Sequence, residues 1–264
     1  LHLLPVVSSA VDATKGEVLR PQLVDRSVPK IILSNYANQC LHLLADQAFV
    51  ALSFSKGALG VPLKIARENF FFLHWFFCRE FITIPGEEEE AFSTALNRLL
   101  RANSIRFAEE STQGSVLSNK IARSVDEIPG DVLVLPSNGE DLQVLCVAVQ
   151  VFLIGYWLVL DTVRATASRD SKRVSERQVV RAAQSRAAEL LENELITARY
   201  QLLSTDLLKN AVHALSHREV LLKVESGGSD HSYQVDFSAL LEKKGRLEQF
   251  IEELPPEAVL KAKL

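Results

Sequence analysis

The sequence predicts a mainly α-helical fold with small β-hairpins, an α+β class, and three observations lead to it. Apolar residues recur at helical spacing through most of the chain between positions 30 and 254. Two pairs of short alternating segments interrupt this pattern, and each pair follows two helices. The 264 residues include 47% hydrophobic and 23% charged side chains. That is enough apolar material for a packed core, and it argues against global disorder.

Caps, prolines and glutamates indicate where the helices of the first half begin. Pro29, after the cap candidate Ser27, suits the first turn of one helix, and Pro62 suits the start of the next. Glutamates at 87–90 suit the start of a third helix, because the helix dipole favours negative charge there. The expected helices are 30–54, 61–81 and 87–103.

A run of aromatic and apolar residues from Phe70 to Cys78 leaves the second helix apolar almost all round. Such a run is typical of a buried helix or a contact surface. It could also line an acyl-chain groove or face a membrane. Core packing is the commoner role, and it is the one we expect.

The expected helices of the second half are 142–160, 175–203, 204–216 and 238–254. Ser175 with Gln178 forms a capping box, and Ser204 begins the cap of the following helix. The stretch 142–160 is long enough to cross a bilayer. Gln150 near its middle and the lack of a Lys/Arg cluster at either end favour a buried helix instead.

Two β-hairpins are expected, each after a pair of helices. The alternating segments are 104–108 with 131–135, and 219–224 with 231–237 around a Gly-Gly turn. The order helix, helix, strand pair therefore occurs twice, over 61–135 and over 175–237. This is the order of a winged-helix-like unit, so we expect two winged-helix-like helix-helix-hairpin units.

The chain divides accordingly into an extended lead-in (1–27), a first helical unit with its hairpin (28–140), a second (141–254) and a tail (255–264). The sequence contains no methionine, so we expect a fragment, a processed form or a sequence from which residues have been lost. Its N-terminus lacks the basic region of a secretory signal.

Charge and cysteine content argue against two classes of protein. With 29 basic and 33 acidic side chains the formal net charge is −4, and a mildly acidic chain is a poor nucleic-acid binder. Three cysteines, Cys40, Cys78 and Cys146, are too sparse for a secreted disulfide scaffold and fit a reducing compartment.

No complete catalytic or cofactor motif occurs in the sequence. A glycine-rich phosphate loop, a C-x-x-C pair and a G-x-S-x-G elbow are all missing, so we expect no cofactor and no metal. His231 and Asp236 match H-x-x-x-x-D, in which an aspartate orients a general-base histidine. Strand residues five apart point to opposite faces, so we interpret this match as chance. His42 and His74 lie on apolar helical faces and are expected to be core or interface histidines.

The tail carries a targeting motif. Ala262, Lys263 and Leu264 have the small, basic, Leu-carboxylate form of the S-K-L peroxisomal address. Two prolines end the preceding helix and leave the last eight residues accessible to a receptor. These three residues are the site residues that the sequence predicts, as a targeting signal, with no catalytic, cofactor-binding or metal-binding residue beside them.

Four segments and the ending together resemble one family, and they occur in that family's order. Residues 34–42 (SNYANQCLH) resemble the S-x-Y-x-N segment in the C-terminal region of glycerol-3-phosphate and dihydroxyacetone-phosphate acyltransferases. Residues 80–86 (EFITIPG), 131–134 (DVLV) and 202–211 (LLSTDLLKNA) are similar to E-F-I-F-L-P-G, D-I-L-V and L-S-S-D-x-x-K-N-A stretches of the dihydroxyacetone-phosphate branch. The A-K-L ending also matches that branch.

The resemblance implies the part of such an enzyme that follows its catalytic domain, since the family's catalytic blocks do not occur in this chain. The parent protein would transfer a fatty acyl group from acyl-CoA to the hydroxyl of dihydroxyacetone phosphate, the entry step to ether lipids. It would act at the lumenal face of the peroxisomal (or glycosomal) membrane. This region would brace the catalytic domain, contact the membrane peripherally and carry the import signal.

The partners that the resemblance implies are acyl-CoA and dihydroxyacetone phosphate at the parent's catalytic domain, the peroxisomal import receptor and alkylglycerone-phosphate synthase, and no nucleic acid. Two alternatives stay open. One is the C-terminal region of a glycerol-3-phosphate acyltransferase, which the A-K-L ending disfavours. The other is a non-enzymatic interaction module with winged-helix-like halves.

Overall fold

The computed structural model describes residues 41–57, 59–108, 128–167, 172–193, 196, 200–224 and 231–252, all of which fall in one compact unit. The expected lead-in at 1–27, the first part of the helix expected at 30–54 and the tail at 255–264 lie outside these residues.

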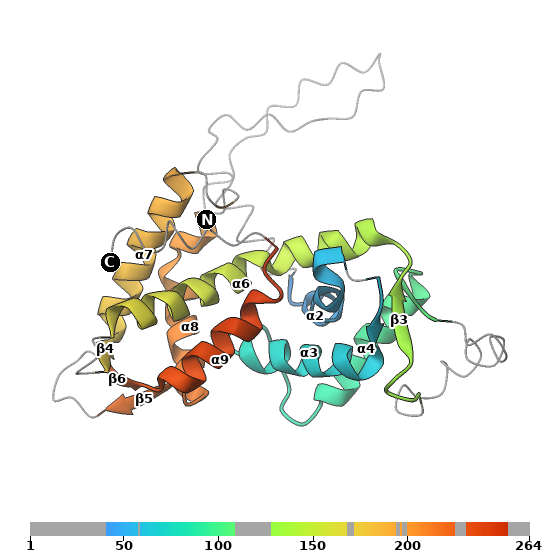
Figure 1. The fold of residues 1–264 in the computed structure, drawn as a ribbon, viewed down its shortest axis with the longest axis horizontal. Helices are drawn as coiled ribbons and strands as arrows, with labels where there is room; N and C mark the ends of the chain where they lie inside the picture. The colour runs from blue at the N-terminus through green and yellow to red at the C-terminus, as the bar shows by residue number, and fades with distance from the viewer. Residues whose placement is uncertain are drawn as a thin grey trace, which may run out of the picture. The chain divides into compact units, whose positions relative to one another are not determined.

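Helices make up most of the described chain, and short strands make up small sheets, as the sequence predicts (Figure 1). The helices are α2 (Ala45–Ala51), α3 (Leu63–Phe76), α4 (Glu88–Arg101), α6 (Gly139–Thr166), α7 (Glu176–Glu192), α8 (Thr205–His217) and α9 (Phe237–Glu248). The strands are β1 (Val61–Pro62), β2 (Ile105–Phe107), β3 (Leu133–Pro136), β4 (Arg173–Ser175), β5 (Leu221–Val224) and β6 (Ser232–Val235). Two 3-10 turns are η1 (Leu52–Gly57) and η3 (Tyr200–Leu203).

The same topology occurs twice. The first half has the element order α2-β1-α3-α4-β2-β3 and an antiparallel sheet in the order β1-β3-β2. The second half has the order α6-β4-α7-α8-β5-β6 and an antiparallel sheet in the order β4-β6-β5. Both expected hairpins are present. We therefore describe the fold as two winged-helix-like units, with α9 following the second.

Each sheet contains a third strand that the sequence prediction missed. β1 and β4 are two and three residues long, too short to show an alternating pattern. Val61 of β1 pairs with Val134, and Val174 of β4 pairs with Tyr233, and all four side chains are buried. Each short strand thus holds a hairpin against the helix that follows it.

Three helices end before their expected positions. α3 ends at Phe76, and residues 77–81 form turns, with the Phe81 N–H donating to the Phe77 carbonyl at 3.1 Å. α7 ends at Glu192 and not near 203, since Asn193 Nδ2 donates to the Glu189 carbonyl at 2.7 Å. α9 ends at Glu248, short of the expected 254.

α6 is a core helix. It is long and apolar enough to cross a membrane, but 72% of its most hydrophobic window is buried inside the protein. Its polar side chains find partners there, as in the hydrogen bond from Gln150 Nε2 to the Phe250 carbonyl at 3.0 Å. Trp157 Nε1 donates to Glu248 Oε1 at 2.9 Å. These contacts favour the buried helix that the central glutamine predicts.

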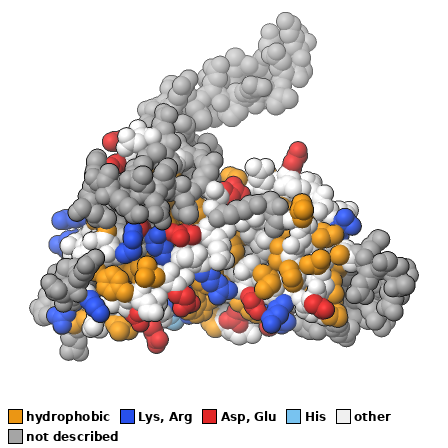
Figure 2. Space-filling model, viewed as in Figure 1, with side chains coloured by type: hydrophobic (Ala, Val, Ile, Leu, Met, Phe, Trp, Pro, Cys, Tyr) orange, Lys and Arg blue, Asp and Glu red, His pale blue; other side chains and the backbone are white. Residues whose placement is uncertain are grey.

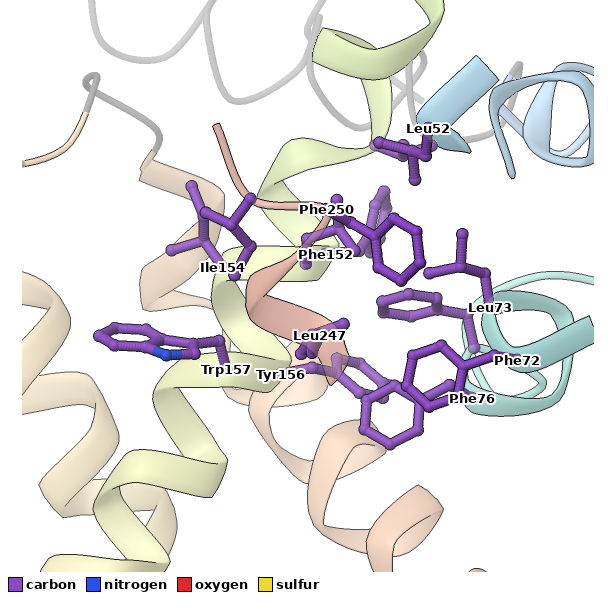
Figure 3. Packing of buried hydrophobic residues seen from close by; sticks show 14 of the residues in the cluster. Leu52, Phe72, Leu73, Phe76, Phe152, Ile154, Tyr156, Trp157, Leu247 and Phe250 are labelled. Atoms are coloured by element: carbon purple, nitrogen blue, oxygen red, sulfur yellow. The ribbon is translucent and has the colours of Figure 1, made fainter. Parts of the chain in front are cut away.

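The phenylalanine run of α3 is packed in the core, as expected. Phe72 stacks on Phe76 and on Phe250, with centroids 5.3 and 6.1 Å away. Phe76 lies 5.5 Å from the Tyr156 ring of α6. Figure 3 shows these rings converging from α3, α6 and the end of α9. Such aromatic contacts add to the stabilisation from burial alone, and they join the two units through one continuous core.

Candidate functional site

The turn after α3 brings a carboxyl group of the first unit against two helices of the second. Tyr156 Oη on α6 donates to Glu80 Oε1 at 3.2 Å, and the Asn210 side chain on α8 also hydrogen-bonds Glu80. The carboxylate of Asp206, on the first turn of α8, acts on Glu80 by its charge. We refer to Glu80, Tyr156, Asp206 and Asn210 as the joint cluster.

The joint cluster holds an acid that titrates near neutral pH. Burial raises the pKa of Glu80 from 4.5 to about 7. Hydrogen bonds from Asn210 and Tyr156 oppose this rise because they stabilise the carboxylate, whereas the negative charge of Asp206 adds to it. Burial, and the charge of Glu80, raise the pKa of Tyr156 well above its usual value. Tyr156 therefore stays protonated and remains a donor while Glu80 changes charge.

Arg218 and Trp75 form a second contact between the two units, near the C-terminal end of α3. Arg218, at the end of α8, lies over the Trp75 ring with Cζ 4.1 Å from the ring centroid. Its Nη2 donates to the Trp75 carbonyl at 2.7 Å and to Cys78 Sγ at 3.3 Å. Cation–π stacking and a charge-assisted hydrogen bond thus hold the end of α8 against the end of α3.

Local sequence signals position the α8 side of the joint. Ser204 Oγ accepts a hydrogen bond from the Leu207 N–H at 3.5 Å, so the predicted cap starts α8. Asp206 and Asn210 are four residues apart and therefore share one face of that helix. Both belong to the segment 202–211, and Glu80 belongs to 80–86. The structure thus brings together two segments that carry the family resemblance.

The chemistry of the joint cluster suits a structural contact. The hydrogen bonds to Glu80 come from protein donors on α6 and α8, and the group can bind or release one proton. A carboxyl group that is fixed by two donors from two helices orients those helices relative to its own turn. We interpret the cluster as the polar contact that fixes the first unit against the second.

The targeting signal predicted at Ala262, Lys263 and Leu264 lies outside the described residues, so it stays a prediction. The segment 34–42 lies largely outside them as well, and only its last two residues are described.

The structure gives the two residues of the H-x-x-x-x-D match separate positions. Asp236 Oδ1 accepts from the N–H groups of Ser238 and Ala239 at 2.9 and 3.0 Å and so caps α9. His231 is exposed at the start of β6, where its carbonyl accepts from the Glu176 N–H at 2.9 Å. The carboxylate is thus committed to a helix cap.

The two histidines that were expected on apolar helical faces differ from each other. His74 is buried and stacks on Phe70 with centroids 5.4 Å apart, and burial lowers its pKa. It is a core histidine, as expected. His42 is exposed in the turn before α2, where its ring contacts Phe81 edge-on at 5.7 Å, so it is not a core histidine.

The described residues contain no group of His, Cys, Asp and Glu side chains that could hold a metal ion. Cys78 and Cys146 are free thiols, and burial raises the pKa of Cys146 to about 12. Cys146 is therefore a protonated core residue.

Sequence reasoning missed Tyr156 and Arg218. A signal for Tyr156 was present, because a tyrosine hydroxyl inside a long apolar run requires a hydrogen-bond partner once buried. Nothing in the local sequence marks Arg218, since its contacts lie 143 and 140 residues away.

One family model matches most of this chain. The model for the glycerol-3-phosphate acyltransferase C-terminal region matches residues 2–224, a range that includes the whole joint cluster and Arg218. The chain therefore belongs to this family of acyltransferase C-terminal regions. As a member of this family, the chain is an acyltransferase-related region with a role in phospholipid metabolism. Searches of curated proteins and of solved structures returned no match.

Proposed function

We propose that this chain is the C-terminal region of a peroxisomal dihydroxyacetone-phosphate acyltransferase. The parent protein transfers a fatty acyl group from acyl-CoA to the hydroxyl of dihydroxyacetone phosphate and so begins ether-lipid synthesis. This region braces the catalytic domain, contacts the membrane peripherally and carries the import signal.

The observation that carries the proposal is the A-K-L ending, in a chain whose segments 80–86 and 202–211 are similar to those of the dihydroxyacetone-phosphate branch. The hydrogen bond between Glu80 and Asn210 supports the use of both segments, because one residue of each lies in the same cluster.

A bracing role agrees with the kind of contacts the region makes. Acyl transfer needs a base near the acceptor hydroxyl and donors for the developing oxyanion. The Glu80 carboxyl group accepts a hydrogen bond from Tyr156, and the Asp236 carboxylate caps α9. Two units joined by α6, an aromatic core and the joint cluster form a rigid support for a neighbouring domain.

The acceptor preference is tested on the parent protein that contains this region. Initial rates are measured with acyl-CoA and either dihydroxyacetone phosphate or glycerol 3-phosphate. We expect a kcat/KM at least tenfold higher for dihydroxyacetone phosphate. A preference for glycerol 3-phosphate would refute the assignment to this branch. The 264-residue chain alone is expected to show no turnover, and turnover that His231→Ala abolishes would contradict the interpretation of that residue.

The import signal is tested with fluorescent fusions in cells with labelled peroxisomes. A receptor pocket for this motif takes the free carboxylate and the Leu264 side chain and pairs with the Lys263 ammonium. Lys263→Glu, or one residue added after Leu264, should abolish co-localisation. Lys261→Glu makes the same charge change two residues upstream and is the control that should still enter. Co-localisation of the Lys263→Glu and extended fusions would rule out the peroxisomal proposal.

The nearest alternative is the glycerol-3-phosphate branch, which the description of the matching family favours. The two tests above separate these candidates. The second alternative is a non-enzymatic winged-helix-like interaction module, and acyl transfer by the parent protein would exclude it.

A further inference from the structure

The start of α7 and the strand before it present basic side chains in an otherwise acidic chain. Between positions 172 and 188 the sequence holds five basic residues and one acidic residue. Arg177 and Arg181 are exposed and four residues apart, so they share one helix face. Lys172 and Arg173, just before the helix, are exposed as well. Figure 2 shows Lys and Arg side chains on the side of the molecule where α7 and β4 are drawn.

The single acidic residue of this stretch is engaged elsewhere. Glu176 Oε2 accepts hydrogen bonds from His213 Nε2 at 3.1 Å and from Tyr233 Oη at 3.3 Å. Its side chain is only 14% exposed. The carboxylate is thus held against α8 and β6.

The basic face is hollowed. Six residues line an open hollow of about 420 Å³: Ser175, Arg177, Gln178, Arg181, Ala182 and Ser185. Its volume lies in the range of small-ligand sites. Among these six residues, two guanidinium groups, one amide and two hydroxyls can donate hydrogen bonds. Guanidinium groups bind phosphate oxygens in a bidentate manner.

An exposed apolar side chain lies across the neighbouring sheet from Arg173. In the register of this sheet, Arg173 and Leu222 both pair with Gln234, one from each side. All three side chains are exposed, Leu222 by 47%. A surface that presents cations beside an apolar side chain is typical of contact with lipid headgroups.

We infer that this face of α7 binds the phosphate groups of anionic phospholipids at a membrane surface, with Arg177 and Arg181 as the main contacts. The inference rests on the peripheral membrane contact of the proposed function. It does not depend on the acyl acceptor or on the organelle.

The test is flotation of the 264-residue chain with vesicles of phosphatidylcholine alone or with 30% phosphatidic acid, at about 0.1 M salt. The charged vesicles should retain the chain, and the neutral ones should not. Arg177→Gln with Arg181→Gln should lower the partition coefficient roughly 30-fold, from two basic residues near an anionic surface. The matched control, Arg101→Gln with Arg106→Gln, removes two exposed charges from the first unit and should change it less than threefold.

Three results would overturn the inference. Equal binding to neutral and anionic vesicles would exclude recognition of phosphate charge. An equal loss of vesicle binding in the control variant would indicate that the net charge of the chain, and not the α7 face, attracts it to the vesicles. No retention by the anionic vesicles, together with saturable binding of glycerol phosphate that the Arg177→Gln with Arg181→Gln variant loses, would assign the hollow to a soluble phosphate ligand. The assay uses neither acyl acceptor nor organelle, so its outcome is separate from that of the two tests of the proposed function.

Discussion

Tyr156 donates a hydrogen bond to Glu80 at 3.2 Å across 76 residues of sequence, and this bond joins α6 of the second unit to the turn after α3 of the first. The tyrosine is fully buried and its ring packs 4.7 Å from that of Phe77. The same side chain thus contributes to the core and to the polar contact between the units.

The first prediction concerns pH. The pKa of Glu80 is about 7 in the folded chain, above its ordinary value of 4.5. The folded state therefore holds this proton more tightly than the unfolded state does. The stabilisation is fully present below about pH 4.5 and is lost as the pH rises through 7. We expect the urea midpoint of unfolding to fall between pH 5 and pH 8, and Glu80→Gln to reduce that fall.

The control for this titration is Glu87→Gln, at an exposed position in the next turn. Burial also raises the pKa of Asp46, so the wild-type slope has more than one source. The difference between the pH slopes of Glu80→Gln and Glu87→Gln therefore reports the titration of Glu80. Equal slopes for Glu80→Gln and the wild type would contradict the assignment.

The second prediction concerns Arg218. Lysine keeps the charge but loses the planar contact with Trp75 and the forked donors. Arg218→Lys should lower the free energy of unfolding by about 1–3 kcal/mol. Arg106→Lys, on an exposed position of β2, should change it by less than about 0.5 kcal/mol. Equal effects in chemical denaturation would show that the Trp75 contact contributes nothing.

The third prediction separates the two residues of the H-x-x-x-x-D match. Asp236→Ala removes the cap of α9 and should cost about 1 kcal/mol of stability. His231→Ala changes an exposed side chain and should be close to neutral. Thermal unfolding of both variants measures this, and the opposite order of effects would refute the capping role.

The fourth prediction concerns the close approach of α6 to α8. A Cβ at Gly155 would lie 2.9 Å from Leu207 Cδ2 and 3.2 Å from its Cγ. Gly155→Val should therefore overpack this contact and destabilise the chain by about 1–3 kcal/mol.

Gly245, in α9, is the matched control because a Cβ there meets nothing within 4 Å. Gly245→Ala should be neutral or stabilise the helix by up to about 1 kcal/mol. If Gly155→Val proved as stable as the wild type, either the Leu207 side chain or the two helices would have to move at little cost.

The sequence predicted the helices and hairpins well where local signals exist. Ser175 and Ser204 both cap the helices that they were expected to start. Gln150 correctly indicated a buried α6. These signals depend on residues within one or two turns of each other, so a single sequence carries them.

The remaining features depend on contacts between distant residues. β1 and β4 are strands only because β3 and β6 pair with them. The early end of α3 matters since it turns Glu80 toward α6 and α8. No periodicity in the sequence could predict the partners of Glu80 or Arg218. Glu80 and Asn210 both lie in segments that resemble the family, but the resemblance does not predict that they are in contact.

α6 has 28 residues, roughly 42 Å at 1.5 Å per residue, and it packs on α2 as well as on α7, α8 and α9. Phe152 from this helix covers Phe81, with centroids 5.0 Å apart. A fragment that ends before α6 would expose the aromatic face of the first unit, and one that begins after it would lack the second unit's first helix. The repeated topology therefore does not give two separable domains, and the region should melt in one cooperative transition.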